Sequence, residues 1–101
     1  MNAGELKVIC VDMDGCISFG DTYSVKQVRE ARPNVKFIRH VNMLSRKNFI
    51  VIYTARRDHL LCETMRWLRL NGVTFHAITN NKCPSDVYID DRAVNIKDVK
   101  M

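Results

Sequence analysis

The chain has 101 residues, of which 47% are hydrophobic and 27% charged, and its formal net charge is +5. This length suits one small domain with a core of its own, so we expect residues 1–101 to form a single domain. No apolar run is long enough to span a membrane, and the first residues do not have the pattern of a signal peptide. We therefore expect a cytoplasmic protein with no membrane partner, whose positive charge attracts anionic ligands.

The first predicted strand covers about residues 6–11 and runs directly into Asp12-Met13-Asp14-Gly15. Side chains two positions apart in a strand point the same way, so Asp12 and Asp14 are expected to face one spot at the end of this strand. Two carboxylates this close repel unless a cation lies between them, and Mg²⁺ prefers oxygen ligands of this kind. The motif alone is equally compatible with a polar strand end and a solvated turn.

Residues 15–32 are polar and irregular, which predicts a loop or flap over the strand end with a short helix at 25–30. Pro33 suits the first position of a helix, and apolar residues at helical spacing follow it, so a helix is predicted over 33–47. The continuous apolar run 49–53 predicts a central parallel strand that is covered on both faces. This strand ends at Thr54-Ala55-Arg56.

A second helix is predicted to begin at Asp58, a favourable N-cap, and to end at Asn71-Gly72, which suits a C-cap. Its inner face is predicted to carry three apolar residues at helical spacing, Leu61, Met65 and Leu68. Trp67 and Leu60 are expected to complete this packing. Cys62 in the same helix and Cys10 in the first strand are expected to be buried, reduced thiols.

A third strand is predicted over residues 73–78, and a loop of turn-forming residues that contains Lys82 follows it. A fourth strand begins at residue 86 and ends in Asp90-Asp91. Helical connections between successive strands imply parallel pairing. The sequence therefore predicts an α/β, three-layer Rossmann-like fold with a small, mostly parallel sheet flanked by helices.

Ligands of such sheets gather outside the carboxyl ends of the strands. All the polar residues noted above follow a predicted strand: Asp12, Asp14, Thr54, Lys82, Asp90 and Asp91. Phosphoryl transfer uses such a set, because one carboxylate can attack phosphorus, another can act as acid and base, and a hydroxyl and an ammonium can bind the oxygens. Each residue alone has an ordinary explanation as a cap, a turn or a solvated side chain, so the prediction depends on their coincidence at one edge.

The ordered motifs Asp12-Met13-Asp14-Gly15, Thr54, Lys82 and Asp90-Asp91 resemble motifs one to four of the haloacid dehalogenase-like (HAD-like) phosphatases, across nearly the whole chain. The segments 54–56 and 82–93 are further similar to small capless members. The resemblance implies a HAD-like fold without a cap domain and Mg²⁺-dependent hydrolysis of a phosphoric monoester through an aspartyl-phosphate.

The same resemblance implies a role for each motif residue. Asp12 would be the nucleophile and a metal ligand, and Asp14 the general acid and base, with its main-chain carbonyl on Mg²⁺. Thr54 and Lys82 would hold the phosphoryl group. The remaining metal ligands would be Asp90, bound directly, and Asp91, bound directly or through water. Arg56 is expected near the site, where it could bind the substrate phosphate.

Two features depart from the family pattern. Cys16 stands where threonine usually follows the glycine, which removes a hydroxyl near the flap. The tail after Asp91 is short, which puts a fifth strand in doubt.

Neither interval 15–33 nor interval 54–82 has room for a cap domain, so we expect an open site. Such a site admits a phosphate on a larger molecule or takes cover from a neighbouring subunit in a homo-oligomer.

Three functions stay open on the sequence. The favoured one is a phosphomonoesterase acting on a sugar phosphate or a similar phosphorylated metabolite. A polynucleotide-end phosphatase suits the basic charge, although the chain has no dense Lys/Arg run of the nucleic-acid type. A non-catalytic phospholigand-binding module is the third. A receiver domain is disfavoured, because its phosphoacceptor Asp lies mid-chain, where this sequence has Thr54.

Overall fold

A four-stranded sheet, in which every neighbouring pair is parallel, forms the centre of the fold. The computed structural model describes residues 6–20, 22–81 and 84–90. In the order in which they pair, the strands are β5 (Ala77–Thr79), β4 (Asn48–Tyr53), β1 (Lys7–Asp12) and β6 (Val87–Ile89). The helices are α1 (Val25–Glu30), α2 (Val35–Leu44) and α3 (Leu61–Leu70). The predicted α/β class with a mostly parallel sheet is therefore confirmed, and the arrangement is consistent with a Rossmann-like fold.

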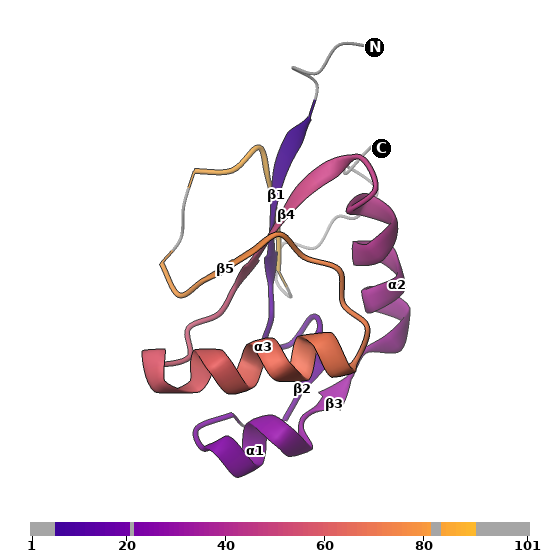
Figure 1. Cartoon of the computed structure of the whole chain (residues 1–101). Helices are drawn as coiled ribbons and strands as arrows, with labels where there is room; N and C mark the ends of the chain where they lie inside the picture. Colours follow the sequence, from indigo (N-terminus) through magenta and orange to yellow (C-terminus); the bar gives the residue numbers. More distant parts are fainter. Residues whose placement is uncertain (1–5, 21, 82–83, 91–101) are drawn as a thin grey trace.

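The pairing of β1 brings three strand ends together. β1 pairs with β4 along its whole length, up to Asp12 opposite Tyr53, and with β6 up to Val11 opposite Ile89. Parallel strands in register finish at the same edge of a sheet, which places the ends of β1, β4 and β6 side by side. Figure 1 shows β1 running down to this edge, with α3 lying below it.

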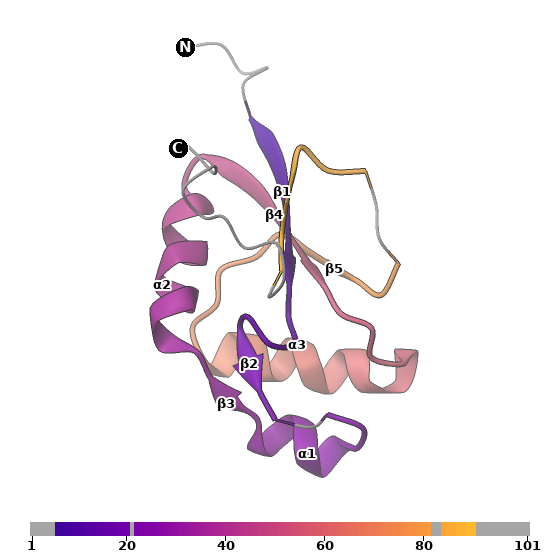
Figure 2. The same cartoon turned by 180° about the vertical axis from the view of Figure 1, so that it is seen from behind.

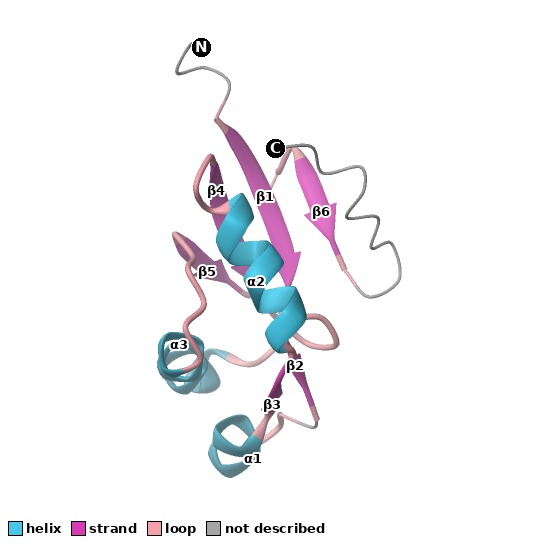
Figure 3. Ribbon diagram, turned by 90° about the vertical axis from the view of Figure 1, so that its right-hand side faces the viewer, coloured by secondary structure: helices cyan, strands magenta, loops and turns pink. Residues whose placement is uncertain are grey.

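Helix α2 covers one face of the sheet (Figure 3). Its buried residues Phe37, Ile38, Val41 and Leu44 join a core with Ile9, Val11, Ile50 and Ile52 of the strands. On the other face, Val51 and Cys10 are buried, whereas Phe49 and Tyr88 are 36% and 43% exposed. The middle of β4 is thus buried on both faces, as its continuous apolar run predicts.

The start of α2 differs from the prediction. Pro33 was expected to be the first residue of the helix, but it lies in the short strand β3 (Arg32–Pro33), which pairs antiparallel with β2 (Ser18–Phe19). Asn34 is the N-cap instead, and its side-chain oxygen accepts a hydrogen bond from the Phe37 N–H at 3.2 Å. The fixed φ of proline suits an edge strand as well as a first helical turn, so the residue does not distinguish the two.

The start of α3 also differs. Asp58 was expected to cap the helix, but it begins a 3₁₀ turn, Asp58–Leu60, that leads into α3. The helix ends as predicted at Asn71 and Gly72, since Gly72 has φ +72° and the Val73 N–H donates to the Leu68 carbonyl at 2.9 Å. These contacts form the expected glycine-dependent cap.

The inner face of α3 is rotated relative to the prediction. Its buried residues are Thr64, Trp67 and Leu68, and Leu60 of the preceding 3₁₀ turn is also buried, whereas Leu61 and Met65 are half-buried. The expected packing of Leu60, Trp67 and Leu68 is confirmed. Cys10 is buried as expected, but Cys62 is exposed, so its prediction as a buried thiol was wrong. The rotation explains this error, because Cys62 lies on the face that points away from the core.

The segment 15–33, called the flap below, is joined to α3 (Figures 1 and 2). It contains β2, β3 and α1, and α1 matches the short helix predicted at 25–30. Arg29 Nη2 and Nε donate to the two Glu63 carboxylate oxygens at 3.1 and 3.2 Å, and Trp67 Nε1 donates to the Ala31 carbonyl at 3.0 Å. These contacts join α1 and the residue after it to α3.

The two intervals where a cap could be inserted are 15–33 and 54–82. Their described residues form the flap in the first, and the 3₁₀ turn, α3 and β5 with their connections in the second. The tail whose short length puts a fifth strand in doubt, residues 91–101, lies outside the described residues. None of the described helices combines the length and the apolarity that a membrane crossing would need.

Candidate active site

The chain turns sharply just after β1. The Met13 N–H still donates to the Tyr53 carbonyl at 2.9 Å, which continues the pairing with β4 by one residue. Gly15 then has φ +88°, a conformation that glycine adopts without strain. The N–H groups of Ile17 and Ser18 return to the Met13 carbonyl at 2.9 and 3.1 Å. Strand alternation therefore ends here, so the rule that placed Asp12 and Asp14 together no longer applies.

The two aspartates line different pockets. Asp14 lines a pocket of about 450 Å³ together with Gly20, Thr22, Tyr23, Ala55, Arg56, Arg57 and Leu60, called the flap pocket below. Asp12 lines a pocket of about 50 Å³ together with Cys10, Tyr53, Tyr88, Ile89 and Asp90, called the strand-end pocket. Asp12 and Asp14 thus border two pockets at the end of β1, and their joint action on one phosphoryl group stays a prediction.

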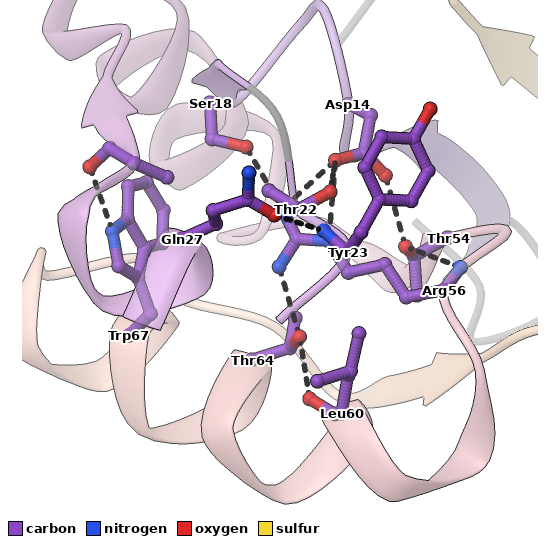
Figure 4. A network of polar contacts seen from close by, with 11 residues as sticks. Asp14, Ser18, Thr22, Tyr23, Gln27, Thr54, Arg56, Leu60, Thr64 and Trp67 are labelled. Carbon is purple, nitrogen blue, oxygen red and sulfur yellow. Dashed lines mark hydrogen bonds and ion pairs between the residues drawn. The ribbon is translucent and has the colours of Figure 1, made fainter. Parts of the chain in front are cut away.

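The Asp14 carboxylate is fixed by four hydrogen bonds (Figure 4). Its Oδ1 accepts from Arg56 Nη2 at 2.8 Å, from Arg56 Nε at 3.2 Å and from Thr22 Oγ1 at 3.2 Å. Its Oδ2 accepts from Thr54 Oγ1 at 3.0 Å. The side chain is 37% exposed, so a carboxylate held in one orientation still faces the flap pocket.

Arg56 joins Asp14 to the flap and to α3. Its side chain is only 2% exposed, and besides Asp14 it donates from Nη1 to Thr64 Oγ1 at 2.8 Å and from Nη2 to Ser18 Oγ at 3.2 Å. Four of its five N–H groups are thus used within the protein. A buried guanidinium needs such partners, because leaving its charge unpaired is costly. Arg56 lies near the site as predicted, but these contacts serve Asp14 rather than a substrate phosphate.

Thr54 lies at the end of β4, as predicted, and is fully buried. Its N–H donates to the Thr79 carbonyl at 3.0 Å, which keeps it at the sheet edge. Its hydroxyl donates to Asp14 and accepts from the Arg56 main-chain N–H at 3.2 Å. The hydroxyl expected to hold a phosphoryl group is therefore directed at the carboxylate expected to act as acid and base.

The strand-end pocket brings together Asp12 and Asp90, which are 78 positions apart in the sequence. The pairing of β1 with β6 causes this, since Asp12 and Asp90 each follow the paired residues Val11 and Ile89. Both aspartates are half-buried. The sequence predicts that the first and last acidic motifs lie together, and Asp12 and Asp90 do so.

The donor chemistry of the strand-end pocket fits Mg²⁺. Mg²⁺ is commonly held by one or two carboxylates and keeps several of its waters, and this pocket offers two carboxylates. Within residues 6–20, 22–81 and 84–90, no group of three or more His, Cys, Asp or Glu side chains gathers around one point. Two further expected site residues, Lys82 and Asp91, lie outside the described residues. Metal binding stays a prediction.

Sequence reasoning missed the partners that fix Arg56 and Asp14, which are Ser18, Thr22 and Thr64. Thr64 carried a usable signal, because it stands four residues after Leu60 and four before Leu68, on the face of α3 that is otherwise apolar. A hydroxyl at such a position needs a partner. Ser18 and Thr22 carried no such signal, since serine and threonine are ordinary flap residues.

No protein-family model matches the chain, and no curated protein or solved structure matches it either. A function must therefore be argued from the residues and their geometry.

Proposed function

We propose that this protein is a HAD-like, Mg²⁺-dependent phosphomonoesterase that works through an aspartyl-phosphate at Asp12. One observation carries the proposal: at the adjacent ends of β1, β4 and β6, Asp12 and Asp90 line one pocket, and Thr54 donates a hydrogen bond to Asp14. These residues come from three separate segments, and each has the chemistry that its place in the reaction requires.

The first half of the reaction transfers the phosphoryl group to the protein. A carboxylate oxygen of Asp12 attacks the phosphorus atom, and the bond between phosphorus and the leaving oxygen breaks. Asp14, in its protonated form, gives its proton to the leaving oxygen, so that an alcohol departs. Asp14 is left as the carboxylate, the form to which Arg56 and Thr54 can donate the hydrogen bonds described above.

The second half returns the protein to its starting state. The Asp14 carboxylate takes a proton from water while the water oxygen attacks the phosphorus atom of the aspartyl-phosphate. The bond to Asp12 breaks, inorganic phosphate leaves, and Asp14 is again protonated. The contacts from Arg56 and Thr54 keep the carboxylate in one orientation, which lowers the entropic cost of both proton transfers.

Mg²⁺, when bound, would neutralise part of the negative charge on the phosphoryl group, and the groups expected to hold it are the side chains of Asp12, Asp90 and Asp91 and the main-chain carbonyl of Asp14. Lys82 is expected to bind the phosphoryl oxygens. The Thr54 hydroxyl, which the resemblance assigns to the same task, is fully buried and donates its proton to Asp14, so its part in the reaction is to orient that carboxylate. The substrate class that this mechanism serves is a sugar phosphate or a similar phosphorylated metabolite.

The test is phosphate release from a panel of phosphomonoesters in the presence of Mg²⁺. Asp12→Asn removes the nucleophile, and Asp58→Asn is the matched control, because it removes an exposed carboxylate that lines neither pocket. We expect the wild type and the control to turn over, and Asp12→Asn to be slower by at least about a thousandfold. Removal of Mg²⁺ with EDTA should stop the wild type.

Equal rates in Asp12→Asn and the wild type would contradict the proposal. Binding of Mg²⁺ and inorganic phosphate without turnover of any ester would also contradict it, and would favour a phospholigand-binding module instead.

A further inference from the structure

We propose that the flap pocket binds the leaving group of the ester, and that Tyr23 and Arg57 select a leaving group with a planar base, as a nucleoside has. This inference rests on the proposed function and narrows it to nucleoside phosphates.

The position of Asp14 assigns the leaving group to the flap pocket. A general acid must come within hydrogen-bonding distance of the oxygen that it protonates. Asp14 lines the flap pocket and Asp12 lines the strand-end pocket, so the leaving oxygen lies on the flap side of the phosphorus atom. The remainder of the leaving group then extends into the flap pocket.

The sizes of the two pockets agree with this assignment. Small-molecule sites usually measure about 300–1,000 Å³. The flap pocket, at about 450 Å³, falls in this range, whereas the strand-end pocket, at about 50 Å³, is much smaller. The small pocket suits a compact charged group, and only the larger pocket can take an organic leaving group.

Two polar groups that line the flap pocket, Asp14 and Arg56, are engaged with other groups of the protein. Asp14 accepts from Thr22, Thr54 and Arg56, and Arg56 uses four of its five N–H groups on protein oxygens. Asp14 and Arg56 therefore have little hydrogen-bonding capacity left for the leaving group. Other side chains of the lining, those of Tyr23, Ala55, Arg57 and Leu60, provide apolar contact, one aromatic ring and one guanidinium.

Tyr23 and Arg57 have the properties of a stacking site. Tyr23 is 84% exposed and lines the flap pocket together with Thr22 and Asp14, all three of which are drawn in Figure 4. Its main chain is held, because its N–H donates to Gln27 Oε1 at 2.9 Å. Arg57 is exposed and lines the same pocket. Aromatic rings and guanidinium planes both stack on nucleobases, and the net charge of +5 favours an anionic nucleotide.

The experiment compares two esters that differ only in the base, adenosine monophosphate and ribose phosphate, both phosphorylated on the primary hydroxyl. We expect the wild-type kcat/KM to be higher for adenosine monophosphate by at least about fivefold, the lower end of what stacking on an aromatic side chain contributes. Tyr23→Leu and Arg57→Gln should each reduce this ratio, mainly through KM, and Tyr23→Phe should keep it.

Two variants control for charge and apolar area. Arg39→Gln removes an exposed positive charge from α2, and Leu70→Ala removes an exposed apolar side chain from the end of α3. Neither residue lines the flap pocket, so both variants should keep the wild-type ratio. Equal kcat/KM for the two esters in the wild type would overturn the inference, as would a ratio that Tyr23→Leu and Arg57→Gln leave unchanged.

A binding measurement separates this inference from the proposed function. Adenosine, the leaving group itself, is titrated into the wild type and into Tyr23→Leu by calorimetry. Adenosine should bind the wild type at least about fivefold more tightly than Tyr23→Leu, even if no ester is hydrolysed. If both esters are hydrolysed but adenosine does not bind, the leaving-group inference fails while the phosphatase stands.

A phosphorylated dinucleotide identifies the source of the nucleoside. A kcat/KM above that of adenosine monophosphate supports a polynucleotide end, and an equal or lower value supports a free nucleotide.

Discussion

The two sides of the end of β1 are built differently, although Asp12 and Asp14 are only two residues apart. Asp14 is fixed by hydrogen bonds from Thr22, Thr54 and Arg56, and through Arg56 it is connected to the flap and to α3. Asp12 lies with Asp90 in a pocket that is about one ninth as large as the flap pocket. The difference indicates that one side orients a proton donor beside an organic group, while the other holds a compact charged group.

The largest effect should come from Asp14→Asn, which keeps the shape of the side chain but cannot donate or accept the catalytic proton. We expect kcat/KM for an alkyl phosphate to fall by about 10²- to 10⁴-fold. An aryl phosphate should lose less, because its leaving oxygen departs more easily without a proton. Steady-state kinetics on both esters measures the difference, and equal losses would contradict the role of Asp14 as the acid.

Arg56→Met tests whether the contacts around Asp14 also stabilise the fold. Breaking a buried ion pair typically costs about 3–5 kcal/mol. We expect about 2–3 kcal/mol here, since the Asp14 side chain is 37% exposed and can be partly resolvated. Urea denaturation measures the free energy of unfolding. The neighbouring exposed arginine provides the control, because Arg57→Met should change stability by no more than about 0.5 kcal/mol.

Part of this architecture follows from the sequence. The apolar run of β4, the acidic end of β1 and the Asn71-Gly72 cap predict elements that the structure contains, because each depends on local patterning. The starts of α2 and α3 were misplaced, because Pro33 and Asp58 suit two local structures equally well and tertiary packing decides between them. The meeting of Asp12 with Asp90 was predictable, since parallel pairing in register places strand ends together.

That Asp12 and Asp14 line different pockets was not predictable from strand alternation. It depends on the turn at Gly15, where the returning hydrogen bonds to Met13 end the two-residue periodicity. The burial of Arg56 against Asp14 was equally impossible to predict from the sequence. An arginine next to a strand end has the same sequence signature whether it binds substrate or is buried against Asp14, and only the positions of Ser18 and Thr64 decide the matter.

A smaller effect should come from Thr64→Val, which keeps the shape of the side chain and removes its hydroxyl. Arg56 Nη1 would then lose its acceptor in a buried position, which should cost about 1–3 kcal/mol. Thr74→Val, at an exposed position, is the matched control. Thr64→Val should also lower kcat more than it changes KM, because Arg56 orients Asp14. A loss of stability with an unchanged kcat would show that Thr64 supports the fold but not the orientation of Asp14.

The smallest effect should come from Glu63→Gln, at the ion pair between α1 and α3. The hydrogen bond from Arg29 lowers the pKa of Glu63 below its usual value of 4.5 and raises the pKa of Arg29. A carboxylate whose pKa is lowered in the folded state adds stability above the unfolded pKa and loses it as the pH falls through the folded pKa. The wild type should thus be slightly more stable than Glu63→Gln at neutral pH.

This difference should shrink below about pH 4.5, where the wild-type carboxyl becomes protonated, and also at high salt, because the pair is at the surface. Urea denaturation at several pH values measures it. A difference that does not change between neutral pH and the acid range would show that Glu63 contributes by packing rather than by charge.

The most direct measurement of the central claim is the mass of the protein after rapid mixing with a phosphomonoester and acid quenching. The ester is an aryl phosphate and the protein is Asp14→Asn, because an aryl leaving oxygen departs with little need of the acid, whereas without the base the aspartyl-phosphate should accumulate. We expect the protein to gain the mass of one phosphoryl group, mapped to the peptide that contains Asp12, and the double variant Asp12→Asn/Asp14→Asn to gain none. Phosphate release by wild-type protein with no phosphorylated peptide in Asp14→Asn, or with the label on another residue, would contradict the account.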